Sequence, residues 1–409
     1  MDPLTNPFSP GAGSPPPELA GRDELIERAR VMLHRVRAGR YEQSLMLVGL
    51  RGVGKTVLLN KVRAMAEELD YSIAMIEAAE GRSLPEVLVP VLRQILYQLD
   101  AMTGISNKVK RSLRVLRSFV GAVKVKVADL EIGLDIDPEK GAADSGDLEA
   151  DLAEMFLALG EAAQDRGRAV AVIVDELQYL SEVEMSALIM AIHRIAQRQL
   201  PVVLVGAGLP QLVGLAGRSK SYAERLFTYP DVGALAPEDA KEALRGPVRV
   251  QGADFTDEAL DELVAVTHGY PYFLQEWGYQ AWNLAAASPI DAEVVRRATT
   301  AAIRKLDGSF FRVRFDRLTP REKEYLRALA ELGPGAHRSG DIADTLGVKV
   351  QSVAPLRGGL IRKGMIYSPA HGDTAFTVPL FDEFMRRTMP QWKPAVRLAH
   401  SVMPPLQNG

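Results

Sequence analysis

Gly49-Leu50-Arg51-Gly52-Val53-Gly54-Lys55-Thr56 is the stretch of sequence that decides the fold. It matches the pattern G-x-x-x-x-G-K-[ST] and lies between an apolar run at 44–48 and a helical pattern that begins at Lys55. Its glycines allow backbone conformations closed to other residues, so successive N–H groups face inward and form a nest for phosphate oxygens. The helix that follows adds the positive end of its dipole. The stretch therefore predicts a phosphate-binding loop between a strand and a helix.

Two side chains of this loop have separate predicted roles. Lys55 reaches the terminal phosphates of a nucleotide, where it also serves catalysis, and the Thr56 hydroxyl is a ligand for Mg²⁺. The predicted cofactors are therefore ATP and Mg²⁺. The loop residues expected to bind the nucleotide are Gly49, Leu50, Arg51, Gly52, Val53, Gly54, Lys55, Thr56 and Val57.

A second feature is the apolar run 169–174, which ends in the two carboxylates Asp175 and Glu176. The carboxyl ends of parallel strands meet at one edge of a sheet, which is also the edge where the phosphate loop begins. We therefore expect Asp175 to hold Mg²⁺ through water and Glu176 to polarise the attacking water as general base. The neighbouring Gln178 either assists this chemistry or lies at the surface, and we favour the surface.

Strands and helices alternate through the first half of the chain. Apolar strands at 44–48, 72–76, 169–174 and 202–205 are separated by helical patterns, which indicates an α/β fold in which helices cover both faces of a parallel sheet. The predicted parts are a Pro-rich arm (1–20), an α/β core (21–235) with an insertion (104–147), a helical lid (236–308), a C-terminal module (309–389) and a tail (390–409).

Composition excludes several classes of protein. The chain has 409 residues, of which 47% are apolar and 25% charged, with a net charge of −3 and no cysteine. These values exclude a mostly disordered chain, a polycation and any thiolate site. Because no apolar run is long enough for a membrane span and no signal peptide is visible, we expect a cytoplasmic protein.

The insertion separates charge of opposite sign. Seven Lys and Arg and no acid lie between Ala101 and Ala128, whereas ten acids and one Lys lie between Asp129 and Glu154. Alternating apolar residues at 123–127 and 130–136 predict a hairpin. The basic stripe 108–126 either pairs with the acidic stretch or contacts nucleic acid, and we favour the internal pairing.

The C-terminal module shows the element order of a winged helix-turn-helix. Helices are expected at 318–330 and 339–346, with a third helix that Ser352 caps and a wing of strands at 365–368 and 374–378. Four basic residues and no acid lie between Leu346 and Gly372, which suits phosphate contacts. Packing against protein is the alternative. The residues expected to contact double-stranded DNA are Lys349, Gln351, Ser352, Arg357, Arg362 and Lys363.

Together, the phosphate loop, the sequence VIVDELQYL at 172–180 and the stretch ELAGRDEL at 18–25 resemble the AAA+-like ATPases of the origin-recognition and archaeal-ATPase type. These ATPases overlap with the STAND NTPases of signal transduction. The resemblance covers about residues 16–390 and implies a P-loop NTPase core, a helical lid and a C-terminal winged helix.

The resemblance also implies roles for further residues. Leu19, Ala20 and Arg22 border the adenine, Pro271 in the lid joins the nucleotide site, and Arg225, with Arg218 as competitor, acts in catalysis on a neighbouring subunit's γ-phosphate.

The sequence departs from this family at two places. Ala207 and Leu209 stand where relatives carry a polar residue that senses the γ-phosphate, and Gly269-Tyr270-Pro271 stands where many have an arginine in the lid. Because both gaps remove stabilisation of transition-state charge, we expect slow hydrolysis and a switch-like use of ATP. Two alternatives stay open: a STAND-type signalling or scaffold ATPase whose winged helix binds protein and whose oligomerisation ATP controls, and a protein that binds nucleotide without turnover.

Overall fold

The computed structural model describes residues 1–11, 19–102, 106–123, 137–370 and 372–395. The chain divides into two compact units, Met1–Ala302 and Ile303–Gly409. Their charges differ in sign: the first unit has 32 Lys and Arg against 42 Asp and Glu, a net charge of −10, and the second has 17 against 10, a net charge of +7. In the described ranges, no helix combines the length and the apolar character that crossing a bilayer requires.

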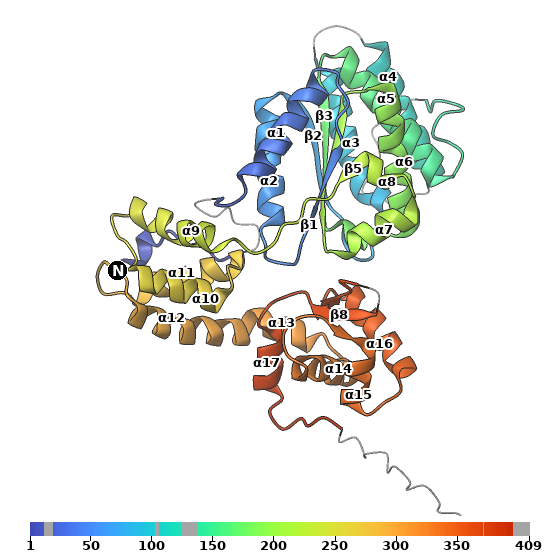
Figure 1. The fold of residues 1–409 in the computed structure, drawn as a ribbon. Coiled ribbons are helices and arrows are strands. Elements are labelled where there is room, and N and C mark those ends of the chain that lie inside the picture. The colour runs from blue at the N-terminus through green and yellow to red at the C-terminus, as the bar shows by residue number, and fades with distance from the viewer. Residues whose placement is uncertain (12–18, 103–105, 124–136, 371, 396–409) are drawn as a thin grey trace, which may run out of the picture. The chain divides into compact units, whose positions relative to one another are not determined.

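A parallel sheet with the strand order β2-β3-β4-β1-β5 forms the centre of the first unit (Figure 1). Every residue of β1, β3 and β4 is buried, which explains why these strands are continuously apolar in sequence. The predicted α/β fold with a parallel sheet is confirmed, and the short edge strand β5 is added to it. The strands are β1 (Ser44–Val48), β2 (Tyr71–Glu77), β3 (Ala169–Asp175), β4 (Val202–Gly208) and β5 (Phe227–Thr228).

Helices cover both faces of this sheet, as predicted. In Figure 1, α1 (Asp23–Arg37) and α2 (Lys55–Glu68) lie on one face, and α5 (Leu148–Asp165) and α6 (Glu182–Arg198) lie on the other. On the second face, alternate residues of β3 and β4 pack with apolar side chains of the helices in one continuous core. The other helices of this core are α3 (Leu84–Asp100), α4 (Asn107–Ala122), α7 (Gln211–Ser219) and α8 (Ala223–Leu226).

Helix α4 contains the first part of the basic insertion. Lys108 contacts Glu161 at 2.7 Å, and Arg114 contacts Glu139 at 2.6 Å. Arg111 lies 3.5 Å from each of these two glutamates. The pairing with the acidic stretch that we favoured is therefore found for Arg111 and Arg114, whereas Lys108 pairs with Glu161 beyond that stretch. The predicted hairpin lies outside the described residues, from position 124 to 136.

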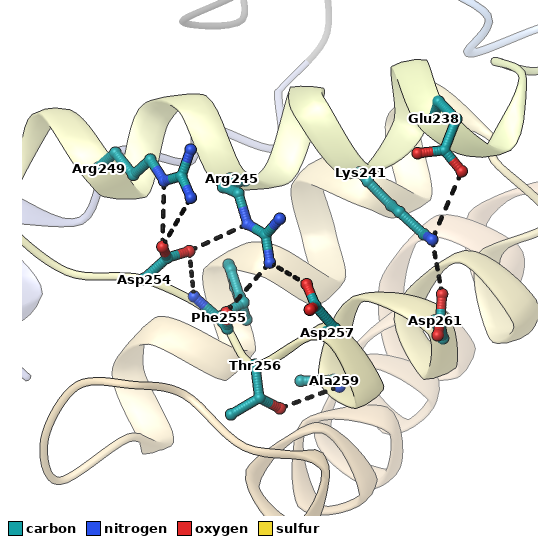
Figure 2. A network of polar contacts seen from close by, with 10 residues as sticks. All are labelled: Glu238, Lys241, Arg245, Arg249, Asp254, Phe255, Thr256, Asp257, Ala259 and Asp261. Atoms are coloured by element: carbon teal, nitrogen blue, oxygen red, sulfur yellow. Dashed lines mark hydrogen bonds and ion pairs between the residues drawn. The ribbon is translucent and has the colours of Figure 1, made fainter.

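The segment predicted as a helical lid contains α9 (Pro237–Val250), α10 (Asp257–Thr267), α11 (Pro271–Leu284) and α12 (Ala292–Lys305). Figure 2 shows that three cations spaced four residues apart on α9 point toward acids on α10 and the turn before it. These pairs fix α9 to its neighbours. They join Lys241 to Asp261 and Glu238, Arg245 to Asp254 and Asp257, and Arg249 to Asp254.

The beginning of the Pro-rich arm packs on α11. Trp282 Nε1 donates to the carbonyl oxygen of Asp2 at 2.8 Å, and Asn6 Nδ2 donates to that of Tyr279 at 3.1 Å. Phe8 is only 3% exposed, and its ring lies 2.7 Å from the position of a Cβ at Gly278. The arm is therefore anchored on the lid by its first residues.

The second unit has the predicted order of helix, helix, helix and hairpin. A small antiparallel sheet of order β6-β8-β7 joins three helices, and Phe311, Phe315, Phe381 and Phe384 form an aromatic cluster in its core. The elements are α13 (Phe311–Asp316), α14 (Pro320–Glu331), β6 (His337–Arg338), α15 (Ser339–Leu346), α16 (Val350–Arg362), β7 (Ile366–Tyr367), β8 (Asp373–Phe376) and α17 (Phe381–Thr388).

The predicted start of the third helix was wrong. Helix α16 begins at Val350 with Lys349 as its N-cap, and Ser352 lies in the first turn, where its hydroxyl donates to the Lys349 carbonyl at 2.6 Å. Pro355 therefore lies in the helix interior rather than in its first turn, and removes one helical hydrogen bond there. Before α13, Leu306–Phe310 forms a short π-helix that continues directly into α13.

Candidate active site

The phosphate loop, residues 49–56, joins β1 to α2 at the carboxyl edge of the sheet. Gly54 has a φ of 95°, in the left-handed region that favours glycine, immediately before the first residue of α2. Gly49 is required for space, since a Cβ there would lie 2.1 Å from the carbonyl oxygen of Val232. The loop therefore needs glycine at both positions, but at Gly49 the reason is crowding rather than backbone angle.

Lys55 is a buried cation, with 6% of its surface exposed. Its Nζ donates to the carbonyl oxygens of Gly49 at 2.9 Å and Leu50 at 2.7 Å. Burial lowers the pKa of Lys55 to about 8, although the nearby Glu176 and Asp175 carboxylates oppose this shift. Within the described ranges Lys55 forms no ion pair, so an anionic ligand is the natural partner for its charge.

Thr56 and Asp175 come together from different elements. Thr56 Oγ1, in the first turn of α2, donates to Asp175 Oδ2, at the end of β3, across 2.6 Å. Burial raises the pKa of Asp175, while the bonds from Thr56 and from the Glu176 N–H oppose this rise. A hydroxyl and a carboxylate side by side form the oxygen donor set that Mg²⁺ prefers, so the residues present fit this ion.

Glu176 follows with a φ of 57°, which is left-handed and strained for a residue with a side chain. Gln178 Nε2 donates to Glu176 Oε2, and Gln178 Oε1 accepts from the Leu209 N–H at 3.0 Å. Gln178 is therefore half-buried between the ends of β3 and β4, not on the open surface as we expected. A Cβ at Gly208 would lie 2.9 Å from Gln178 Oε1, so this glycine makes room for the amide.

Comparison with known proteins agrees with this geometry. Residues 18–205, which include the phosphate loop and both carboxylates, match the AAA ATPase domain family. Over these residues the chain is similar to an AAA ATPase domain. Residues 308–385 match a domain of unknown function, DUF8462, and no curated protein matches the sequence.

Among solved structures, the fold is similar to the Walker-type ATPase PABY2304 of Pyrococcus abyssi, with a TM-score of 0.53 and 20% identity over 90% of this chain and 96% of that one. The Aeropyrum pernix Orc1 protein in complex with DNA matches at a TM-score of 0.46 and 16% identity, over 91% and 94% of the two chains. The Thermotoga maritima RuvB Holliday junction branch migration motor matches at 0.43 and 14%, over 94% and 100%. The AAA+ fold predicted from the motifs is confirmed.

Arg22 connects the start of the ATPase domain to the phosphate loop. Its Nη2 donates to the carbonyl oxygens of Val53, at 3.4 Å, and Gly233. Burial lowers the pKa of Arg22, and Asp231 and Asp239 oppose the shift. Arg22 therefore lies beside the nucleotide-binding loop, whereas contact of Leu19 and Ala20 with the adenine stays a prediction.

The lid approaches the ATPase domain at the same loop. The Tyr270 hydroxyl donates to the Arg51 carbonyl, and the Tyr272 N–H donates to the Gly52 carbonyl at 3.1 Å. Pro271 lies between these two tyrosines, which places it next to the loop. The three cations of α9 form ion pairs with acids of the lid itself (Figure 2). Contact of Pro271 with a nucleotide stays a prediction.

Two arginines were candidates for action on a neighbouring subunit, and the structure distinguishes them. Arg218 Nε contacts Glu182 at 2.8 Å on the surface of the ATPase core. Arg225 is exposed and forms no ion pair within the described ranges; its carbonyl oxygen accepts from Gln43 at 3.0 Å. Of the two arginines, Arg225 is therefore the one without an ion pair in the described part of its own chain.

The predicted DNA contacts fall into two groups. Arg357 is held inside its unit, where its guanidinium donates to Thr374 Oγ1 at 2.9 Å and to Ser368 Oγ at 2.6 Å. Lys363 forms an ion pair with Glu322 at 2.7 Å. Both side chains therefore have partners within their own unit, and their contact with DNA stays a prediction. The remaining candidates are exposed: Lys349, Gln351, Ser352 and Arg362.

Proposed function

We propose that the protein is an ATP-driven molecular switch that hydrolyses ATP slowly. The observation that carries the proposal is the Thr56–Asp175 contact beside the buried Lys55 charge. ATP would place its terminal phosphates at Lys55, and Thr56 and Asp175 would hold the Mg²⁺ that accompanies it. Bound Mg²⁺ supplies neutralisation of phosphate charge. Glu176 accepts a proton from the attacking water at its carboxylate.

We expect slow ATP hydrolysis because the end of β4 and the lid offer few donors or free cations to the phosphates. Ala207 and Leu209, at the end of β4, are buried and carry no side-chain hydrogen-bond donor. The three cations of α9 are engaged within the lid. The negative charge of the transition state would thus lack two stabilising groups, a polar side chain at the end of β4 and an arginine of the lid. Arg225 of another copy would have to supply such a group.

We further propose that the second unit is a winged helix-turn-helix that engages duplex DNA. Its net charge of +7 and the exposed Lys349 and Arg362 on α16 support contact with phosphates. With Arg357 and Lys363 engaged internally, two cations remain at α16. With two phosphate contacts, the logarithm of the binding constant should fall with the logarithm of the salt concentration with a slope of only about −1.8. One copy would therefore bind weakly, and an assembly would bind better.

The alternative is a STAND-type ATPase whose second unit binds protein. Val348 and Val350 favour this alternative, because they flank Lys349 with 45% and 47% of their surface exposed. ATP would then control oligomerisation rather than DNA engagement.

Fluorescence anisotropy with a labelled duplex, titrated with salt in the presence and absence of ATP and Mg²⁺, separates these functions. DNA engagement predicts binding at about 50 mM salt that weakens as salt rises. The double variant Lys349→Ala/Arg362→Ala should then bind more weakly, and Arg312→Ala, whose partner is Asp316 in α13, should not. Absence of binding at low salt, in both nucleotide conditions, would discard DNA engagement and favour a protein partner.

A further inference from the structure

Arg51 lies at the tip of the phosphate loop and carries a positive charge. Its side chain is half-buried, and within the described ranges it forms no ion pair. Its Nε is buried and has no hydrogen-bond partner. A buried N–H of a charged group without a partner is costly, so the position suits an incoming anion.

Tyr179 holds this guanidinium beside the catalytic edge of the sheet. The Arg51 Nη2 donates to the Tyr179 hydroxyl oxygen at 2.7 Å, and Tyr179 follows Glu176 by three residues in the 3₁₀ turn Leu177–Tyr179. The Tyr270 hydroxyl donates to the carbonyl oxygen of Arg51. Both the backbone and the side chain of Arg51 are thus fixed, one by the lid and the other by the end of β3.

Arg51 and Lys55 concentrate positive charge at one place. Both cations lie on one short loop, four positions apart. Such like charges destabilise each other unless an anion lies between or beside them. ATP carries a terminal phosphate that ADP lacks. A second cation that contacts this phosphate would therefore strengthen the binding of ATP more than that of ADP.

We propose that the Arg51 guanidinium binds the terminal phosphate of ATP from within the same chain, with Tyr179 as its positioning residue. This inference rests on the proposed ATP-binding function and deepens it. Arg51 would supply charge that the end of β4 and the lid do not, so that the loop itself distinguishes ATP from ADP. A guanidinium presents several N–H donors to phosphate oxygens and keeps its charge at all physiological pH values.

The test is isothermal titration of the full-length protein with Mg²⁺ and either AMP-PNP or ADP. Loss of a charge-assisted hydrogen bond predicts that Arg51→Ala weakens AMP-PNP binding about 10- to 100-fold and leaves ADP binding within about threefold. Arg51→Lys should retain part of the preference for AMP-PNP. Tyr179→Phe should lower the same preference less than Arg51→Ala does, because it removes the anchor and not the charge.

Arg63→Ala is the matched control, since Arg63 lies on α2 and pairs with Glu67 on the surface. It should leave both affinities unchanged, and the melting temperature of each variant shows whether it is folded. Equal weakening of AMP-PNP and ADP by Arg51→Ala, or no change in either, would overturn the inference while ATP binding stands. A wild-type protein that binds neither nucleotide would instead remove the proposed function itself.

Discussion

The Thr56 hydroxyl and the Asp175 carboxylate lie 2.6 Å apart, although 119 positions separate them in the chain. One residue opens α2 and the other ends β3, so the contact depends on the parallel sheet that places both at one edge. No metal-ligating cluster of three or more His, Asp or Glu side chains occurs in the described ranges. A divalent cation at this edge would be held by the Asp175 carboxylate, the Thr56 hydroxyl and the phosphates of the nucleotide.

Asp175→Asn is predicted to remove the effect of Mg²⁺ on nucleotide binding. The amide keeps the size of the side chain but loses the charge that attracts the cation. Wild-type affinity for ATP should rise when Mg²⁺ is added, and that of the variant should change little, with turnover lower by about 100-fold or more. Titrations with ATP, with and without Mg²⁺, measure the effect. A variant that responds to Mg²⁺ as the wild type does would contradict the assignment.

Glu176→Gln is predicted to lower kcat by about 10²- to 10⁴-fold while ATP affinity stays close to that of the wild type, since a general base acts on water and not on the phosphates. Phosphate release under saturating ATP measures kcat. An unchanged background rate in both proteins would indicate that the protein binds nucleotide without turnover.

Gln178→Ala is predicted to lower kcat by a smaller factor, about 3- to 30-fold, with little change in KM. Its amide holds the Glu176 carboxylate and the Leu209 N–H at once, so its removal loosens the base without touching the loop. The conservative variant Gln178→Asn, which is shorter, should rescue part of the loss. A change in KM alone would instead assign Gln178 to nucleotide binding.

The pKa of Lys55, about 8, predicts that ATP affinity depends on pH. Phosphates favour the protonated amine, which predominates below pH 8 and is lost as pH rises through that value. Affinity should therefore fall about tenfold between pH 7 and pH 9. Lys55→Arg provides the control, because a guanidinium does not titrate in this range: its affinity is expected to be lower but independent of pH. A flat profile for the wild type would contradict the lowered pKa.

Arg225→Ala is predicted to abolish any increase of turnover per molecule with protein concentration, because Arg225 has no ion-pair partner within the described part of its own chain. An arginine supplied in trans contributes about 10³- to 10⁵-fold in related chemistry, so even a partial effect is measurable. Arg218→Ala is the matched control, since Arg218 pairs with Glu182. Equal losses in the two variants would assign neither to a subunit interface.

The central sheet and the phosphate site are predictable from sequence because each depends on local patterns. Strands buried on both faces are continuously apolar, and the order strand, loop, helix brings Lys55, Thr56 and Asp175 to one edge. The roles of Gln178 and Tyr179 were not predictable, since their partners Leu209 and Arg51 are distant in the chain. The only indication of these roles in the sequence is the polar pair Gln178-Tyr179 within DELQYL at 175–180.

In the second unit, too, the partners of individual side chains were not predictable from local sequence. Local composition gives α16 a positive face, but it does not distinguish Arg357, which the sheet residue Thr374 holds, from the exposed Arg362. The start of α16 was misplaced because Ser352 is a good N-cap residue in isolation, whereas the N-cap is Lys349, three residues earlier. Tertiary contacts decide both cases.

Isothermal titration of the full-length protein with ATP and Mg²⁺, beside the variant Lys55→Ala, tests the central claim most directly. If the loop holds a triphosphate, the wild type should show saturable heat at one site per chain, and the variant should show almost none. Absence of heat with the wild type, or an equal signal from the variant, would contradict the account of this site.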